Sequence, residues 1–286
     1  MEHSVYYNKS AELIVRQYCQ KIRIRRILGM ILACTDVIMF QYFMKTLGYL
    51  LGGVLILPIY LLSIFVLLMG ISFFDFRSFN SLSQILYNDC DPAKYQEVLK
   101  SIQALDKRRK VRGDICLELA AAALAQGKDE EGAEYLEQVT FKKFILSREL
   151  KKLGCYADYH DLQGDFIGLH QIEEELYELK ANVGVEGDYY EEIEHRISLV
   201  QAMASREHES INSQRERWTM LYGIASNPLQ ENLYLMRLAR LELAQGKREL
   251  SMRHLGFVAA EGNTLYCAVE AVHILTCMKQ QKVSAF

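Results

Sequence analysis

The sequence predicts an all-α protein in which an N-terminal transmembrane helical hairpin precedes a domain of paired helices. Three observations support this fold class. The 286 residues include only three prolines, although half of the chain is hydrophobic. Two long apolar stretches lie near the N-terminus, and most of the remaining chain repeats its apolar residues at helical spacing. Few helix breakers and such a period favour helices over strands.

The first segment, residues 1–26, predicts a basic amphipathic helix. Ser10 is a suitable N-cap residue. The apolar face that follows consists of Ala11, Ile14, Val15, Tyr18, Cys19 and Ile22. Basic residues such as Arg16 and Lys21 lie on the rest of the helix surface, which suits a helix on an anionic inner leaflet. The alternative is that the helix continues into the first span and its apolar stripe packs on the C-terminal domain.

Residues 27–74 predict a two-helix transmembrane hairpin. The stretch 27–44 carries one charge, Asp36, and the stretch 46–74 carries none. Because a bilayer core requires about 20 helical residues, both stretches are long enough to span it. A signal peptide is the competing interpretation of the first stretch. It is disfavoured because this stretch begins late and a second span follows at once.

The distribution of basic residues predicts the orientation of the hairpin. Of the seven Lys and Arg residues before residue 75, six precede the first span and Lys45 alone lies in the hairpin loop. The positive-inside rule therefore places both termini in the cytoplasm, at the inner (plasma) membrane of a bacterial-type cell. Seven scattered cysteines without a CxxC pair agree with a reducing compartment and disfavour a zinc site.

Asp36 predicts a polar contact inside the membrane. Pro58 lacks an N–H group, so the carbonyl of Val54 loses its helical donor. A neutral Asp36 would donate to that carbonyl, with Tyr60 approaching from the same helix, and would pin the two spans together. The alternative role is contact with another membrane subunit or proton coupling, because intramembrane acids are costly unless they are paired.

A linker over residues 75–91 is expected before a cytoplasmic helical domain over 92–286. Asp91 and Pro92 provide an N-cap and a first helical residue. The pentapeptide LAQGK then occurs twice, with turn glycines at Gly127 and Gly246. Large and small residues flank both turns at the same offsets: Leu119, Ala120, Gly132 and Leu136 at the first, and Leu238, Ala239, Ser251 and Leu255 at the second. This order suits two closely packed antiparallel helices.

The pattern resembles the tetratricopeptide helical hairpin, over roughly residues 92–280. The Leu-Ala pairs stand at the Leu-Gly pair of that family, and Gly132 and Ser251 stand at its small residue on the second helix. A weaker third copy has its turn at Gly164. Cys116 and Leu235 replace the first Trp of the family, and the spacing of the two LAQGK glycines is not a multiple of about 34 residues. The resemblance implies an α-solenoid with a concave surface for a protein or peptide.

The sequence predicts neither an enzyme nor a bound metal or cofactor. It contains no HExxH, GxSxG, Walker or GxGxxG motif. The ExxH at Glu192 and His195 lacks the companion ligands of a di-iron site. The chain beyond residue 74 has a net charge of −7, which disfavours nucleic acid as a partner.

A binding role follows from the membrane hairpin and the helical domain. We expect a membrane-anchored scaffold or adaptor that binds a protein or peptide at the inner face of the bilayer. The alternative is a regulatory or accessory subunit of a transporter or signalling complex, within a larger membrane complex, that acts through its hairpin. The expected aromatic anchors are Tyr156, Tyr159, His160, Tyr189, Tyr190 and Trp218. The alternative is that these rings pack between the helix pairs.

Overall fold

The protein is all-α in the residues that the computed structural model describes, which are 3–47, 49–105, 112–141, 144–183, 187 and 189–283. Side chains are described for all of these residues except 47, 49–56 and 281–283. The chain divides into two compact units. One is the helical hairpin Lys9–Ser83, and the other combines Met1–Asn8 with Gln84–Phe286 and is called the helical domain below.

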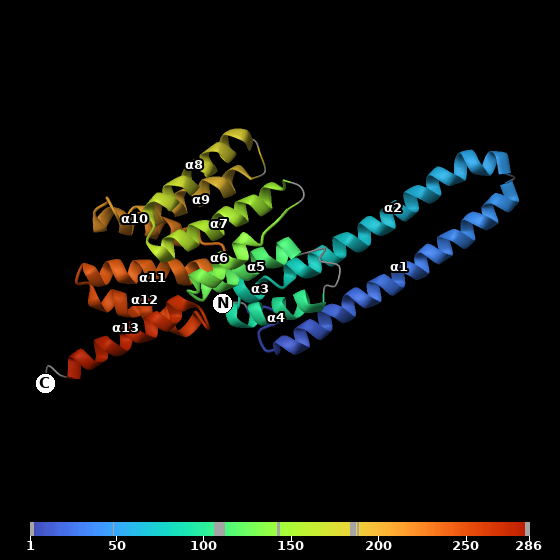
Figure 1. Ribbon diagram of the computed structural model, residues 1–286. Helices are drawn as coiled ribbons and strands as arrows, with labels where there is room; N and C mark the ends of the chain where they lie inside the picture. Colours follow the sequence, from blue (N-terminus) through green and yellow to red (C-terminus); the bar gives the residue numbers. More distant parts are fainter. Residues whose placement is uncertain are drawn as a thin grey trace. The chain divides into compact units, whose positions relative to one another are not determined.

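The hairpin consists of α1 (Ala11–Leu47) packed on α2 (Tyr49–Ser81) (Figure 1). Ser10 caps α1 as predicted, because its hydroxyl accepts from the Leu13 N–H at 3.4 Å. Both helices are long and apolar enough to cross a membrane. In the most apolar 18-residue windows of α1 and α2, only 6% and 0% of the residues are buried, so the chain itself leaves these apolar surfaces uncovered.

Two predicted boundaries differ from the structure. The segment 1–26 and the first span are not separate elements, because α1 runs unbroken from Ala11. The predicted linker 75–91 is largely helical, since α2 continues to Ser81 and α3 occupies Gln84–Tyr87. Charge ends the apolar stretch at Asp75 without ending the helix. Asp75 is instead paired with Arg25 of α1 at 3.4 Å, and Arg25 also donates to the carbonyl of Phe74 at 2.6 Å.

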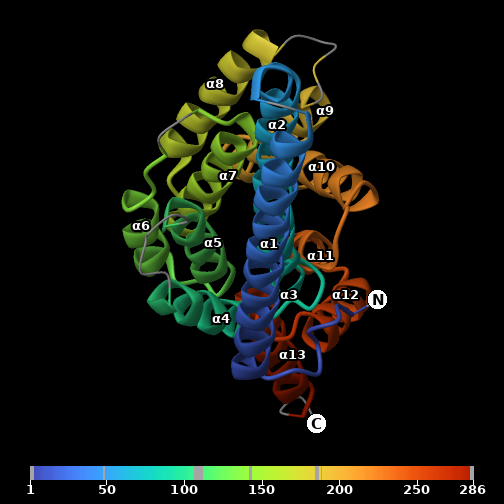
Figure 2. The ribbon, with the colours of Figure 1, turned by 90° about the vertical axis from the view of Figure 1, so that its right-hand side faces the viewer.

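The helical domain is a series of helices that each contact the next (Figure 2). After α3, the helices are α4 (Pro92–Leu105), α5 (Arg112–Ala125), α6 (Asp129–Glu137), α7 (Leu146–Gln163), α8 (Phe166–Val183), α9 (Tyr190–Ala204), α10 (Ile211–Gly223), α11 (Pro228–Ala244), α12 (Arg248–Glu261) and α13 (Tyr266–Val283). Contacts also join α5 with α7, α7 with α9, and α11 with α13. Odd-numbered helices therefore adjoin one another along much of the series.

The two LAQGK segments form the turns of α5–α6 and α11–α12. Gly127 and Gly246 adopt φ values of 71° and 75°, and Gly164 between α7 and α8 adopts 68°. In each turn the residue after the glycine donates its N–H to the carbonyl five residues earlier, at 2.8–3.0 Å. This bond is the signature of the Schellman motif, whose left-handed position favours glycine. The three turns share one local geometry.

The small residues next to these turns lie where helices approach closely. A Cβ on Gly132 would lie 2.7 Å from the Leu124 side chain. Ser251 is fully buried and donates its hydroxyl to the carbonyl of Ala239 at 2.8 Å. Ala120 and Ala239 are also fully buried. A larger side chain at any of these positions would push two helices apart.

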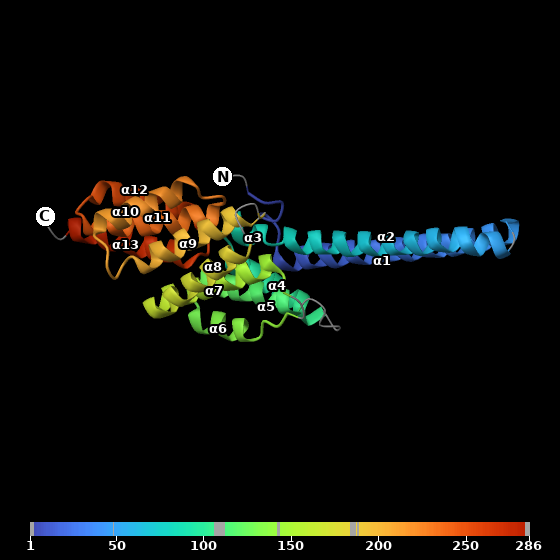
Figure 3. The ribbon, with the colours of Figure 1, turned by 90° about the horizontal axis from the view of Figure 1, so that it is seen from above.

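The beginning of the helical domain is bound to its later part (Figure 3). Here α3 contacts α11. Thr264 donates its N–H to the carbonyl of Cys90 at 3.3 Å and its hydroxyl to Asp91 at 2.9 Å. Asn263 donates to the carbonyl of Asp89 at 3.2 Å. Asp91 also caps α4 as predicted, accepting from the Lys94 N–H at 3.1 Å. These bonds tie residues far apart in sequence.

Candidate functional site

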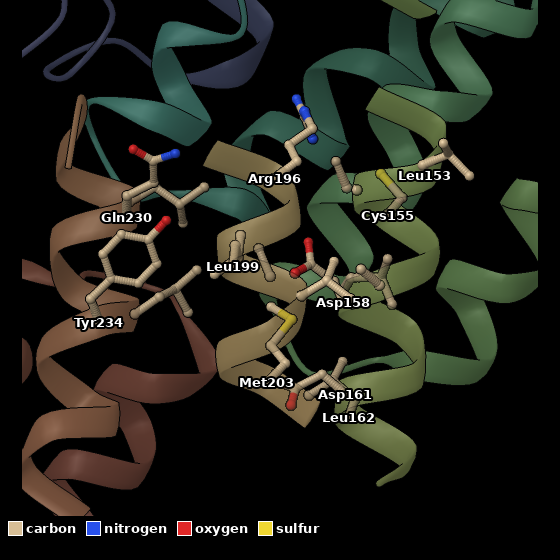
Figure 4. Close-up of a pocket in the computed structure, with 18 of the residues that line it drawn as sticks. Leu153, Cys155, Asp158, Asp161, Leu162, Arg196, Leu199, Met203, Gln230 and Tyr234 are labelled. Atoms are coloured by element: carbon tan, nitrogen blue, oxygen red, sulfur yellow. The ribbon is translucent and has the colours of Figure 1, made fainter. Parts of the chain in front are cut away.

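A cavity of about 180 Å³ lies inside the helical domain (Figure 4). Its walls come from α3, α5, α7, α8, α9, α10, α11 and α13, with most of the polar groups on α7, α9 and α11. On α7, Cys155, Asp158 and Leu162 follow one another at helical spacing and face the cavity. Gly154, Ala157 and Ala121 leave room there because their side chains are small or absent.

Asp161 is the best-compensated charge in the cavity wall. Its carboxylate is buried and accepts from the guanidinium groups of both Arg206 and Arg237. Arg237 lies over the ring of Trp218, with 5.9 Å between the guanidinium carbon and the ring centroid. Because a buried carboxylate needs paired donors, these contacts fix the positions of α7, α11 and the segment after α9 around the cavity.

Lys151 and Arg196, the other cations of the wall, also have partners. The Lys151 ammonium lies 2.5 Å from Glu118, which additionally accepts from the Tyr95 hydroxyl at 2.9 Å. Burial lowers the pKa of Lys151, but the charge of Glu118, the neighbouring Tyr87 and the hydrogen bond to Glu118 together outweigh this effect and raise the pKa overall. Arg196 is bound to Glu192, one turn earlier on α9, at 2.9 Å.

Asp158 differs from these groups because it has no direct partner among the described residues. None of them donates a hydrogen bond to its carboxylate or forms an ion pair with it within 4.0 Å. Burial and the nearby charge of Asp161 raise the pKa of Asp158 to about 7, although Arg196 and Arg237 act in the opposite direction. Figure 4 shows its carboxylate directed into the cavity from α7.

Aromatic groups of α10 and α11 form another part of the cavity wall. Tyr234 of α11 faces the cavity (Figure 4), and its hydroxyl lies 3.4 Å from Nε2 of His195. The Tyr234 and Trp218 rings are in contact, with centroids 5.7 Å apart. Leu199 and Met203 of α9 add apolar surface. The cavity thus combines an apolar interior with one unpaired carboxylate.

Of the six predicted aromatic anchors, Trp218 alone lines the cavity. Tyr156 and Tyr159 lie on another face of α7 and pack against the core residues Leu117, Ala120, Leu124, Leu136 and Cys155. His160 contacts Asp165 at the α7–α8 turn, with 2.8 Å between Nδ1 and Oδ2.

Tyr189 and Tyr190 begin α9, where the ammonium of Lys180 lies 4.8 Å from the centroid of the Tyr190 ring. The predicted anchors therefore occupy different parts of the helical domain.

The sequence did not indicate Asp158 or Tyr234 as residues of the site. For Asp158 a signal existed, because no basic residue stands three or four positions from it on α7 to form a helical ion pair.

In the hairpin, Asp36 contacts a residue that the sequence did not single out. Ser63 donates its hydroxyl to Asp36 Oδ2 at 2.9 Å and also lies 2.9 Å from the carbonyl of Tyr60. The Tyr60 ring stacks on Phe40 with centroids 4.6 Å apart. Pro58 lies inside α2, as the sequence requires. Val54 is helical, but its side chain lies outside the described part of the chain.

No cluster of three or more His, Cys, Asp or Glu residues suited to a metal occurs in the described part of the chain. Comparisons with protein-family models, with curated proteins and with solved structures each found no match for this chain. The chemistry of the cavity and of the hairpin must therefore carry any functional argument.

Proposed function

We propose that this protein is a membrane-anchored scaffold or adaptor. In this proposal α1 and α2 span the inner (plasma) membrane, and the helical domain is a tetratricopeptide-like α-solenoid that binds a protein or peptide in the cytoplasm. The observation that carries the proposal is the cavity, which is lined largely by odd-numbered helices of successive pairs. In helical-repeat proteins, the inner helices of successive pairs form the concave binding surface.

The N-terminal segment supports an orientation with both ends of the hairpin on one side. Ser4 donates its N–H to Asp89 Oδ1 at 2.6 Å, and Lys94 donates to the carbonyl of Tyr7 at 2.9 Å. Residues 3–8 thus bind the same unit as the chain beyond residue 84. Because the hairpin lies between these segments in sequence, it must leave that unit and return to it, which requires an even number of spans.

A topology reporter tests this orientation. A reporter fused after Phe286 of the full chain should behave as cytoplasmic, because six basic residues precede the first span and Lys45 alone lies in the hairpin loop. A second reporter inserted after Gly48 should behave as external. A cytoplasmic signal from the loop reporter, or an external signal from the C-terminal one, would contradict the proposed topology.

Site-specific photo-crosslinking tests the adaptor role in cells. A photoreactive residue at Leu233, which lines the cavity, should crosslink a soluble partner, whereas one at Ile167, an exposed position on α8 outside the cavity wall, should not. A soluble product that forms equally at both positions would contradict binding in the cavity. A product confined to a membrane protein would also contradict binding in the cavity, and it would support the accessory-subunit alternative.

The bond between Ser63 and Asp36 favours a structural role for Asp36 within the hairpin.

A further inference from the structure

We propose that the cavity at Asp158 binds an organic ammonium group on a short apolar stem. This inference goes beyond the proposed function, because it concerns the chemistry of the ligand and does not require the ligand to be part of a protein. The ammonium would pair with the Asp158 carboxylate, and the stem would lie against the apolar wall.

The balance of charge in the wall points to a cation. Arg237 is bound to Asp161, Lys151 to Glu118, and Arg196 to Glu192. An anionic ligand would therefore compete with a partner already in place at each of these cations. Asp158 has no such partner among the described residues, so its ionised form is the uncompensated charge of the wall. A cationic ligand would supply the positive charge that the Asp158 carboxylate lacks.

The size and surface of the cavity point to a small alkyl stem. A cavity of about 150 Å³ in another protein holds benzene, so 180 Å³ has room for a ligand of similar or slightly larger size. Leu199, Met203 and Leu233 offer apolar contacts. The Tyr234 ring adds a π face on which a cation is favourable. Butylammonium, which has the shape of a lysine side chain, fits these requirements.

Fluorescence of the purified full chain in detergent tests the proposal. Trp218 is the single tryptophan and lies in the cavity wall, so its emission reports on occupancy. Butylammonium should give a saturable change, whereas butan-1-ol and butyrate, which match its stem, should not. Saturable binding of butyrate or butanol in place of butylammonium would overturn the proposal.

Matched variants assign the binding to Asp158. Asp158→Asn should weaken butylammonium binding at least tenfold, whereas Glu178→Gln, which removes an exposed carboxylate on α8, should leave it unchanged. Asp158→Asn should remain folded because it removes a half-buried charge that has no direct partner among the described residues, and at pH 8 its melting temperature should exceed that of the wild type. Wild-type affinity in a folded Asp158→Asn variant would overturn the proposal.

The pH dependence gives a second readout. Binding requires ionised Asp158, whose pKa in the free protein is about 7, so the affinity should fall roughly tenfold for each pH unit below that value. Raised pKa values keep Lys151 and Arg237 charged and Cys155 and Tyr234 neutral between pH 6 and 8, and Asp161 and Arg196 also face Asp158. Burial lowers the pKa of His195, which favours its neutral form. An affinity that is constant from pH 6 to 8 would contradict the role of Asp158.

The source of the ammonium group is resolved by comparing ligands. A short peptide with one lysine and blocked termini is titrated beside butylammonium and the same peptide with that lysine acetylated. Tighter binding of the lysine peptide would assign the site to a protein partner and support the adaptor role. Tighter binding of butylammonium would assign the site to a free amine and would count against the adaptor role while supporting the ammonium site. Equal binding of the acetylated and unmodified peptides would contradict both.

Discussion

Replacing Asp161 with alanine is expected to destabilise the helical domain by about 3–5 kcal/mol, because it leaves two partly buried arginines without their shared carboxylate. The side chain of Arg237 is only 12% exposed, so bulk solvent compensates poorly for the lost partner there. Trp218 lies beneath Arg237 and is the single tryptophan. Denaturant unfolding of the full chain in detergent, followed by Trp218 fluorescence, therefore measures the effect where it arises.

The control for this prediction is a more exposed ion pair beside the same cavity. Glu192→Ala removes the partner of Arg196, in a pair whose Glu192 side chain is 43% exposed and whose Arg196 side chain is 26% exposed, so its cost should stay at about 1 kcal/mol. Replacing Asp161, Arg206 and Arg237 together by apolar residues should recover much of the lost stability, because no unpaired charge then remains. Equal losses in Asp161→Ala and Glu192→Ala would show that the Asp161 cluster is not a buried structural centre.

The sequence predicted the helices and turns of this protein better than their boundaries. Helical spacing, few prolines and the glycines of the LAQGK segments are local signals, and the positive φ of Gly127 and Gly246 confirms the turns. The sequence placed the end of the apolar span before Asp75, whereas α2 continues to Ser81, because a charged residue that pairs with Arg25 is compatible with a helix.

The candidate site was less predictable, because it depends on which faces of distant helices meet. Tyr156 and Trp218 are similar signals in the sequence, yet the first packs on the core of α5–α7 and the second lines the cavity. Asp158 acquires its significance only because the two arginines near it have other partners, Arg237 in Asp161 and Arg196 in Glu192. Likewise, Ser63 contacts Asp36 through the register of α1 on α2, which is set by the packing of the two helices and not by local sequence.

Ala239→Trp should unfold the α11–α12 pair and cost more than about 3 kcal/mol, a large part of the stability of an ordinary domain. Ala239 is fully buried, and its carbonyl accepts from the hydroxyl of Ser251 on α12, so no space exists for an indole between the two helices. Leu243→Trp is the matched control, since Leu243 lies one turn later on α11 with 38% of its surface exposed, and it should cost less than about 1 kcal/mol. Thermal unfolding of the full chain in detergent, followed by circular dichroism, gives the melting temperatures of both variants. Limited proteolysis should show early cleavage between α11 and α13 in Ala239→Trp alone. Equal melting temperatures for the two variants would mean that α11 does not pack on α12 through Ala239, and the correspondence between the two LAQGK hairpins would then fail.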